Sequence, residues 1–389
     1  MSIDESQVAE TVAAVVDPEL RRPLGELGMV GGVRVRRRRV EVELALPVAH
    51  YPQVDELVDR VRRAVGAEHG VGEVAVEPVV MDEQSRARLR SLLRGDPVEG
   101  GSEPVSPGHG HTHGGALGHE EGRPNRFMHP RSKTRVLGIA SGKGGVGKSS
   151  VTVNLAVALA RLGLDVGILD ADVYGFSVPA MLGVTADPLI IGDLVVPPTA
   201  NGVRCLSMGY FVPDETPVIW RGPMLHKALE QFLVDAYWGE PDYLLVDMPP
   251  GTGDVTLSLG QYLTKTEMYV VTTPQSAAGR VAQRSAYAAR KLKLAVRGVV
   301  ENMSWFTADD GTRYELFGAG GGQRLAGELG VPLLAQVPLV PHLRQGGDQG
   351  IPVTVAEPDS EVAGVFHGLA ASIIELGPAR VYRQELTLR

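Results

Sequence analysis

A short stretch of glycine, lysine and serine carries the clearest chemistry in this sequence. Residues 141–151 read SGKGGVGKSSV and contain the spacing G-x-x-x-x-G-K-S, which is typical of loops that bind phosphate groups. The glycines allow backbone N–H groups to surround an anion without Cβ clashes. Lys148 can reach the β- and γ-phosphates of a nucleotide, and the hydroxyl of Ser149 is a suitable ligand for Mg²⁺. The residues predicted to bind the nucleotide in this loop are Gly142, Lys143, Gly144, Gly145, Val146, Gly147, Lys148 and Ser149.

The segments on either side of this loop are those that a phosphate site requires. The apolar run RVLGIA at 135–140 predicts a short buried strand, and VTVNLAVALARL at 151–162 has the length and the nearly continuous apolar face of a helix. The N-terminus of that helix adds a partial positive charge where a phosphate would bind. A flexible glycine turn with two solvated lysines is the alternative, but it requires neither the strand nor the helix. The sequence therefore predicts a nucleotide-binding site.

Three aspartates that follow apolar runs are candidates to complete the site. Asp247 ends the run LLVD, where a carboxylate has few structural uses, and it suits the binding of Mg²⁺ through a water opposite Ser149. Ser149 and Asp247 are therefore the predicted metal ligands. Asp170 and Asp172 also follow an apolar run, and Asp170 either serves the nucleotide site or caps a turn or helix. The stretch TTPQ at 272–275 is either a further loop beside the nucleotide or an ordinary turn.

From residue 133 onward, apolar segments of strand length alternate with segments of helix length. This order predicts an α/β fold with a mostly parallel, doubly wound sheet and helices on both faces, as in P-loop NTPase domains. In such sheets ligands bind at the carboxyl ends of the strands, where the motifs above fall. The first predicted strand ends at 140, and the later ones cover 166–170, 203–207, 243–247, 268–272, 296–301 and 333–337. The predicted helices cover 148–162, 222–238, 276–292, 321–329 and 360–376.

Residues 1–95 have the pattern of a small α+β domain. Their apolar residues predict the order helix, strand, strand, helix, strand, with a hairpin of period two over 33–46 and an amphipathic helix over 54–65. The arginines at 34 and 36–39 form either a nucleic-acid patch or the solvated side and tip of that hairpin.

A change of composition separates this domain from the P-loop domain at 133–389. Residues 96–132 contain mainly Gly, Pro, Ser, Glu and His, with almost no aliphatic side chains. Such a composition cannot bury a core and predicts a disordered linker. Its histidines either bind Ni²⁺, Cu²⁺ or Zn²⁺ loosely or hold no metal. They are His109, His111, His113 and His119.

The overall composition narrows the class of protein. The chain has 389 residues, 43% of them hydrophobic and 22% charged, as in ordinary globular proteins. Its formal net charge of −8 argues against non-specific binding to nucleic acid or to anionic membranes. The start MSIDESQVAE lacks the features of a secretory signal and no apolar run has the length of a membrane span, so we expect a cytoplasmic protein. Cys205 is the only cysteine, and we expect a buried, inert thiol.

A second lysine makes the phosphate loop more specific. Lys143 directly follows the first glycine and gives the variant K-G-G-x-G-K-S. The stretch SGKGGVGKS resembles the MinD/ParA-type ATPases. The resemblance covers residues 133–370, and three further stretches narrow it to the Mrp/ApbC branch, which is linked to iron–sulfur cluster delivery. These stretches are LDADVYGFS at 169–177, VDMPPGTGD at 246–254, and ENMS at 301–304 followed by FGAGGG at 317–322.

The resemblance implies a slow ATP hydrolase that works as a homodimer with Mg²⁺. It assigns catalytic roles to Lys148, to Lys143, which would reach the nucleotide of the partner subunit, and to Asp172, which would orient the attacking water from the first switch loop. Gly251 in the second switch would sense the γ-phosphate through its backbone. Asn302 would hydrogen-bond the adenine edge, so that ATP is favoured over GTP.

The ligands that this family usually provides for a cluster are missing from the sequence. Mrp-type carriers usually hold a [4Fe–4S] cluster at the dimer interface by a C-x-x-C pair, but residues 305–314 read WFTADDGTRY. The DPEL…LGELGMV pattern at 17–30 resembles SufT/PaaD-like iron–sulfur assembly domains, which often contain a G-C-P turn, but this chain has AHYP at 49–52. An iron–sulfur cluster is therefore expected from the family without its usual thiolate ligands.

Three functions are compatible with these observations. The first is an ATPase of iron–sulfur cluster assembly or transfer, whose partners are a second copy of the chain and client apoproteins or assembly factors. The second is a nucleotide-switched scaffold that docks client proteins through residues 1–95 without carrying a cluster. The third, a partition or positioning ATPase, needs a membrane-binding tail or a basic DNA surface, and the C-terminus and the net charge favour neither. We therefore expect no nucleic acid and no membrane among the partners.

Overall fold

The computed structural model describes residues 4–95, 125–129, 131–173, 175–211, 222–251 and 254–379. The chain forms two compact units. Unit 1 contains Met1–Glu120 and two later pieces, Pro188–Val196 and Asp235–Gly239. Unit 2 contains Glu121–Asp187, Pro197–Val234 and Glu240–Arg389. The sequence pattern gave no sign that pieces from beyond the linker join the first unit.

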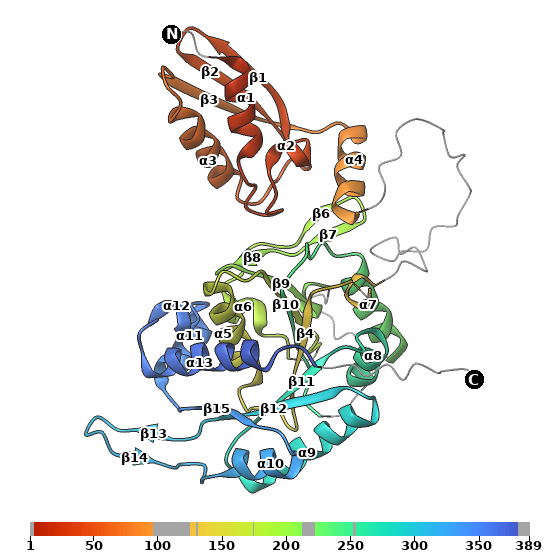
Figure 1. Ribbon diagram of the computed structural model, residues 1–389, viewed down its shortest axis with the longest axis vertical. Helices are drawn as coiled ribbons and strands as arrows, with labels where there is room; N and C mark the ends of the chain where they lie inside the picture. Colours follow the sequence, from red (N-terminus) through yellow and green to blue (C-terminus); the bar gives the residue numbers. More distant parts are fainter. Residues whose placement is uncertain are drawn as a thin grey trace. The chain divides into compact units, whose positions relative to one another are not determined.

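The core of unit 2 is an eight-stranded sheet in the order β15-β12-β11-β4-β10-β5-β9-β8. All neighbouring strands are parallel except β8 with β9. Helices cover both faces, which is why the strands read as continuous apolar runs, and the predicted doubly wound α/β fold is confirmed (Figure 1). The strands are β4 (Arg135–Ser141), β5 (Val166–Asp170), β8 (Thr199–Ala200), β9 (Val203–Ser207), β10 (Tyr243–Asp247), β11 (Glu267–Thr272), β12 (Ala295–Asn302) and β15 (Leu333–Val337).

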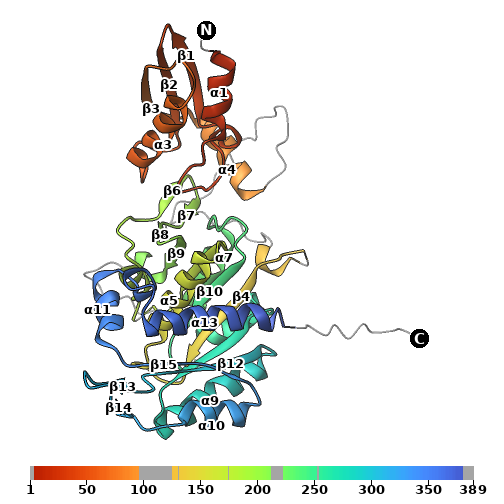
Figure 2. The same ribbon diagram turned by 60° about the vertical axis from the view of Figure 1, so that its left-hand side comes forward.

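Successive residues of the central strands face opposite layers of helices, as the pleat of a strand requires. Val271 and Val300 lie in the core that contains α5 and α13, whereas Val270 and Val299 pack with α9 and α10. Figures 1 and 2 show these helix layers on either side of the sheet. The helices are α5 (Lys148–Arg161), α6 (Val178–Leu182), α7 (Gly222–Val234), α8 (Asp254–Tyr262), α9 (Ser276–Lys291), α10 (Gly321–Leu329), α11 (Pro341–Gln349), α12 (Val353–Ala356) and α13 (Glu361–Leu376).

Unit 1 is built on a three-stranded sheet in which β1 (Val30–Arg36) pairs antiparallel with β2 (Arg39–Leu46), and β2 pairs parallel with β3 (Glu73–Val80). Helices α1 (Glu5–Ala14) and α3 (Val54–Gly66) bury apolar residues in the core of this unit, so the predicted order of elements is observed. Three elements of unit 1 were not predicted. They are α2 (Leu24–Leu27), α4 (Glu83–Arg94) and the hairpin β6 (Leu189–Ile191) with β7 (Leu194–Val196).

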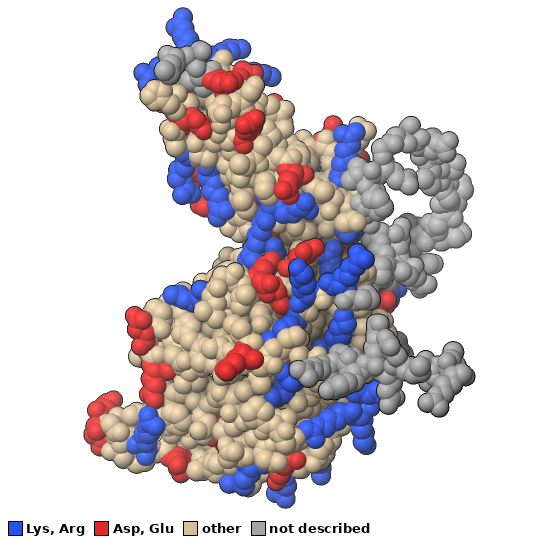
Figure 3. All heavy atoms as spheres, viewed as in Figure 1, with Lys and Arg blue, Asp and Glu red and all other residues tan. Residues whose placement is uncertain are grey.

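The arginine run of unit 1 lies along and at the tip of the β1–β2 hairpin. Arg36 and Arg39 are paired at the turn, Arg39 forms ion pairs with Glu41 and Glu73, and all of these side chains are exposed or half-buried. Figure 3 shows carboxylates among the basic side chains on the face of each unit that it presents. The arrangement fits the second interpretation of this run, the solvated side of a hairpin.

The last part of the predicted linker is ordered within unit 2. The 3₁₀ helix η1 (Arg126–Met128) buries Phe127, and Nδ2 of Asn125 donates to the carbonyl oxygen of Tyr262 at 2.9 Å. At 125–129 the structure therefore differs from the predicted disordered linker. Residues 96–124, with the four histidines, lie outside the described residues. Among the described helices, none combines the length and the apolar character that a membrane crossing requires.

Candidate nucleotide-binding site

The phosphate loop connects β4 to α5, as predicted, and its glycines are needed for its shape. Gly145 and Gly147 both have φ of +77°, a region that other residues rarely adopt. A Cβ at Gly142 would lie 2.2 Å from the backbone nitrogen of Ala282 in α9. Only glycine therefore lets the loop pass α9 at this distance.

The loop forms one wall of an open cavity of about 420 Å³ at the carboxyl end of the sheet. Residues of the loop, of the segment after β5 and of the segment after β10 meet there. The lining residues are Ser141, Lys143, Gly144, Gly145, Val146, Gly147, Lys148, Ser149, Ser150, Asp172, Gly175, Ser177, Met181 and Pro250. The cavity therefore contains most of the predicted nucleotide-binding residues.

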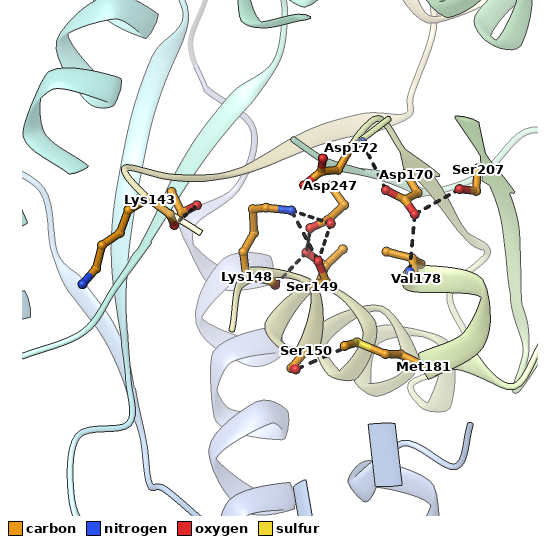
Figure 4. Close-up of polar contacts among 12 residues, drawn as sticks. Lys143, Lys148, Ser149, Ser150, Asp170, Asp172, Val178, Met181, Ser207 and Asp247 are labelled. Carbon is orange, nitrogen blue, oxygen red and sulfur yellow. Dashed lines mark hydrogen bonds and ion pairs between the residues drawn. The ribbon is translucent and has the colours of Figure 1, made fainter. Parts of the chain in front are cut away.

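Asp247 is the centre of the polar contacts at the base of this cavity (Figure 4). Its Oδ2 accepts from Nζ of Lys148 at 2.5 Å and from Oγ of Ser149 at 2.7 Å. Its Oδ1 accepts from Oγ1 of Thr152 at 2.6 Å. Thr152 was missed by the sequence reasoning, although its place one turn after Lys148 puts both on the same face of α5. Thr152 thus fixes the orientation of the carboxylate that faces the loop.

The donors at this point fit Mg²⁺, which binds to one or two protein oxygen ligands and completes its shell with phosphate oxygens and waters. The Ser149 hydroxyl and the Asp247 carboxylate lie 2.7 Å apart, and both are hard oxygen donors beside the cavity. Lys148 is 7% exposed and brings a positive charge to the same place. The site can therefore hold a metal–nucleotide complex.

Asp170 has the capping role that was one of its two interpretations. Its Oδ1 accepts from N of Asp172 at 3.2 Å, and its Oδ2 accepts from N of Val178 at 3.4 Å and from Oγ of Ser207 at 3.0 Å. Burial, together with the charge of Asp247, raises the pKa of Asp170 to about 7. Asp170 thus holds the start of α6 and the backbone of Asp172, and Asp172 itself lines the cavity.

Lys143 extends away from Lys148 and Asp247 (Figure 4). Its Nζ donates to Oε1 of Gln275 at 3.2 Å, at the end of the TTPQ stretch. Lys143 lines the cavity but does not contact Asp247. Within one chain the ammonium group of Lys143 therefore points away from Lys148, Ser149 and Asp247.

Two residues of the predicted site use their polar groups to support the loop. Asn302 is 3% exposed, its Nδ2 donates to the carbonyl oxygen of Val146 at 2.9 Å, and it does not line the cavity. The N–H of Gly251 donates to the carbonyl oxygen of Ser141 at 2.9 Å. The adenine contact of Asn302 and the phosphate contact of Gly251 stay predictions. The neighbouring residues 252 and 253 lie outside the described residues.

The two places where a thiol was expected from the family hold other groups. Residues 305–314, where a C-x-x-C pair was expected, contain a small hairpin of β13 (Phe306–Thr307) with β14 (Arg313–Tyr314) in unit 2. The second, in unit 1, places Tyr51 in a buried position, where its hydroxyl donates to Oδ1 of Asp17 at 2.8 Å. Burial raises the pKa of Asp17, whose Oδ2 has no hydrogen-bond partner among the residues that the structure describes. A phenol bonded to a carboxyl group is no ligand set for a cluster.

Cys205 does not replace those thiols. It lies on β9 with 0% exposure, and burial raises the pKa of its thiol well above the usual value. Thiolate is the form that binds metal, so this cysteine is inert. Over the described ranges, no three His, Cys, Asp or Glu side chains are grouped in a way that could hold a metal ion. The residues present therefore do not fit an iron–sulfur cluster bound within one chain.

Comparisons with known proteins show the family to which the chain belongs. Residues 132–374 match the family described as NUBPL iron-transfer P-loop NTPase, and residues 5–76 match the family described as iron–sulfur cluster assembly protein. The iron–sulfur cluster carrier protein of Mycobacterium bovis is 45% identical over 370 residues, which are 93% of this chain and 91% of that protein. The carrier protein of Bacillus subtilis is 40% identical over 347 residues, covering 87% of this chain and 88% of that protein.

A solved structure supports the fold of unit 2. A nucleotide-binding protein from Archaeoglobus fulgidus, in complex with ADP, has a TM-score of 0.52 and 33% sequence identity with this chain. The match covers 60% of this chain and 93% of that one.

Proposed function

This chain belongs to the family of iron-transfer P-loop NTPases, and we propose that it binds and slowly hydrolyses Mg–ATP to control the assembly or transfer of iron–sulfur clusters. The observation that supports this proposal is the meeting of Lys148, Ser149 and Asp247 beside one open cavity. The role in iron–sulfur cluster assembly or transfer is supported by relatives that are named as cluster carriers and by the match of residues 5–76 to cluster assembly proteins.

In this proposal hydrolysis depends on charge neutralisation. Lys148 exchanges its bond with Asp247 for the β- and γ-phosphates, since it is the buried cation at the loop. Ser149 and Asp247 would hold Mg²⁺, and the ion would supply positive charge to the phosphates. Thr152 keeps the Asp247 carboxylate in place while Lys148 is exchanged.

Two further residues act on the phosphate in the proposal. Asp172 orients the attacking water, because it lines the cavity and its backbone is held by Asp170. Lys143 reaches the nucleotide of a second copy of the chain in a homodimer. Its direction away from Lys148 is what a contribution in trans would need (Figure 4). The preference for ATP through Asn302 belongs to the same proposal.

A second candidate function is a nucleotide-switched scaffold that docks client apoproteins through unit 1 and carries no cluster. The observation that favours it is the absence of usable thiols: Cys205 is fully buried, and Tyr51 takes the position of the expected turn cysteine. The ATPase is the same in both candidates. They differ only in whether iron is bound by this protein.

Anaerobic reconstitution separates the two candidates. The full chain and its Cys205→Ser variant are incubated with iron and sulfide, and iron per dimer and visible absorption are measured with ATP turnover. A carrier binds about one cluster per dimer and passes it to an apoprotein. Iron at background in both proteins, with ATP turnover intact, supports the scaffold and contradicts the carrier.

A further inference from the structure

Unit 1 contains two pieces of chain that the sequence places within the P-loop domain. The hairpin β6–β7 lies between α6 and β8, and Asp235–Gly239 lies between α7 and β10. The two pieces bind each other through their backbones. N of Val195 donates to O of Asp235 at 3.1 Å, and N of Tyr237 donates to O of Val195 at 2.7 Å. Together they form a short paired extension whose ends continue into unit 2.

The side chains of this extension complete the hydrophobic core of unit 1. Ile191 and Val196 are fully buried in the same cluster as Leu20 and Leu93. The hydroxyl of Tyr237 donates to the carbonyl oxygen of Leu20 at 3.3 Å, directly after the DPE turn. Because these aliphatic side chains are buried members of that cluster, the core of unit 1 is incomplete without the hairpin.

Ion pairs hold the turn of the hairpin against α4 of the same unit, and the ribbons of the hairpin and α4 lie close together in Figures 1 and 2. Asp193 at the turn lies 2.5 Å from Nη2 of Arg94 and 3.5 Å from Nε of Arg90. The Arg94 side chain is only 12% exposed, so this pair is partly shielded from solvent. At Gly192 a Cβ would lie 2.3 Å from Nη1 of Arg90. The hairpin is thus held at α4 by opposite charges, and a side chain at position 192 would displace Arg90.

The hairpin is the tip of a longer segment, from Val178 to Ser207, and both ends of this segment are bonded to Asp170 beside the nucleotide site. Going back from β6, α6 begins at Val178, whose N–H donates to Oδ2 of Asp170. Going forward from β7, β9 ends at Ser207, whose hydroxyl donates to the same Oδ2. The other oxygen of Asp170 accepts from N of Asp172. One buried carboxyl group therefore joins Asp172 to both ends of the segment, as Figure 4 shows.

We propose that the segment from Val178 to Ser207 transmits the state of the nucleotide site to unit 1, with Asp170 at its base and the β6–β7 hairpin at its tip. A shift of Asp172 on nucleotide binding changes the bonds of Asp170 and so moves both ends of the segment, the start of α6 and the end of β9. The hairpin cannot move without repacking the core of unit 1 beside Leu20, which follows Asp17, Pro18 and Glu19. This inference rests on the proposed function, because nucleotide binding at the loop is its input.

Hydrogen exchange of the full chain, with Mg²⁺ alone and with Mg²⁺ plus a non-hydrolysable ATP analogue, tests the proposal. In the wild-type chain we expect the analogue to change exchange in the phosphate loop and also in the hairpin and α4. Asp193→Ala should bind the analogue within about twofold of wild type, since the residue lies outside the cavity. In this variant the analogue should no longer change hydrogen exchange in α4. Ser207→Ala should lose the same response from the base of the segment.

A matched control removes an ion pair of unit 1 that is not part of the segment. Asp59→Ala breaks the exposed pair of Asp59 with Arg62 on α3, 3.4 Å apart, and should keep the full response. If Asp193→Ala lowers the melting temperature, Tyr237→Phe repeats the test, because it removes a single hydroxyl and keeps the ring. A response in α4 that Tyr237→Phe reduces supports the proposal.

The outcomes separate this inference from the proposed function. Protection of the phosphate loop without any change in the hairpin or α4 overturns the inference and leaves the ATPase intact. An α4 response that survives in both Asp193→Ala and Ser207→Ala also overturns it. No protection of the phosphate loop by the analogue contradicts the proposed function itself.

Discussion

Replacing Thr152 by valine tests how the Asp247 carboxylate is held. The two side chains have nearly the same shape, so the substitution removes the donor at 2.6 Å from Oδ1 of Asp247 without opening a cavity. Thr152 and Asp247 are both fully buried, so water cannot replace the lost bond. Oδ2 keeps its bonds to Lys148 and Ser149, and the carboxylate is then free to rotate about them.

The size of the effect follows from the charge of the acceptor. A hydrogen bond to a charged group contributes about 1.5–3 kcal/mol, and about 1.4 kcal/mol corresponds to a factor of ten. Partners that orient a metal ligand usually change metal affinity about 10- to 100-fold. We therefore expect Thr152→Val to need about 10- to 100-fold more Mg²⁺ for half-maximal ATP turnover.

The assay is ATP turnover of the full chain over a series of Mg²⁺ concentrations. Thr152→Ser, which keeps the hydroxyl, is the matched control and should follow the wild-type curve. Thermal unfolding of all three proteins shows whether they are folded. If the Mg²⁺ curve of Thr152→Val coincides with that of the wild type, Thr152 does not position Asp247 and the reasoning is wrong.

Three other predictions concern residues on and around the site. Lys143→Ala should keep nucleotide binding, measured by calorimetry, and lose hydrolysis, because the proposed contact is made in trans; wild-type turnover would argue against that contact. Cys205 should react with a thiol reagent only after denaturation, since it is fully buried with a raised thiol pKa; rapid reaction in the native protein would contradict its burial. The raised pKa of Asp170, about 7 against 3.8 for an ordinary aspartate, means that the folded chain keeps a proton that the unfolded chain releases. Stability in urea should therefore fall as pH rises from about 4 to about 7, and Asp170→Asn should flatten that fall, whereas equal slopes would exclude Asp170 as its source.

The phosphate loop and the sheet were predictable because their signals are local. The loop pattern fixes the order strand, glycine turn and helix, and the apolar runs mark strands that are covered on both faces. The carboxyl ends of parallel strands meet at one edge, so Asp247 and Asp172 were expected beside the loop. The family resemblance came from the same motifs and is confirmed by the comparisons.

The supporting contacts were not predictable, because they join residues far apart in the sequence. Thr152 and Asp247 are separated by 95 positions, and Ser207 and Asp170 by 37. Hydroxyl residues on a helix or at a strand end carry no signal until the packing of that element is known. For the same reason Asn302 was given only an adenine contact, whereas its amide supports the loop at Val146.

The hairpin β6–β7 shows a different limit of sequence reasoning. Its apolar residues would suit the core of either unit, and only the fold assigns Ile191 and Val196 to the first. A composition change at 96–132 marked one boundary, but a unit can also include a later piece of the chain. The physical reason is that burial is proportional to the apolar area removed from water and does not depend on position in the sequence.

The most direct test of the account is ATP turnover of the purified full chain beside its Lys148→Ala variant. Lys148 is buried at the cavity and bonded to Asp247, so its loss should remove the charge that holds the phosphates. Lys133→Ala, at an exposed lysine outside the cavity, is the matched control. We expect turnover to fall to background in Lys148→Ala and to stay unchanged in Lys133→Ala. Undiminished turnover in Lys148→Ala would contradict the assignment of the nucleotide site.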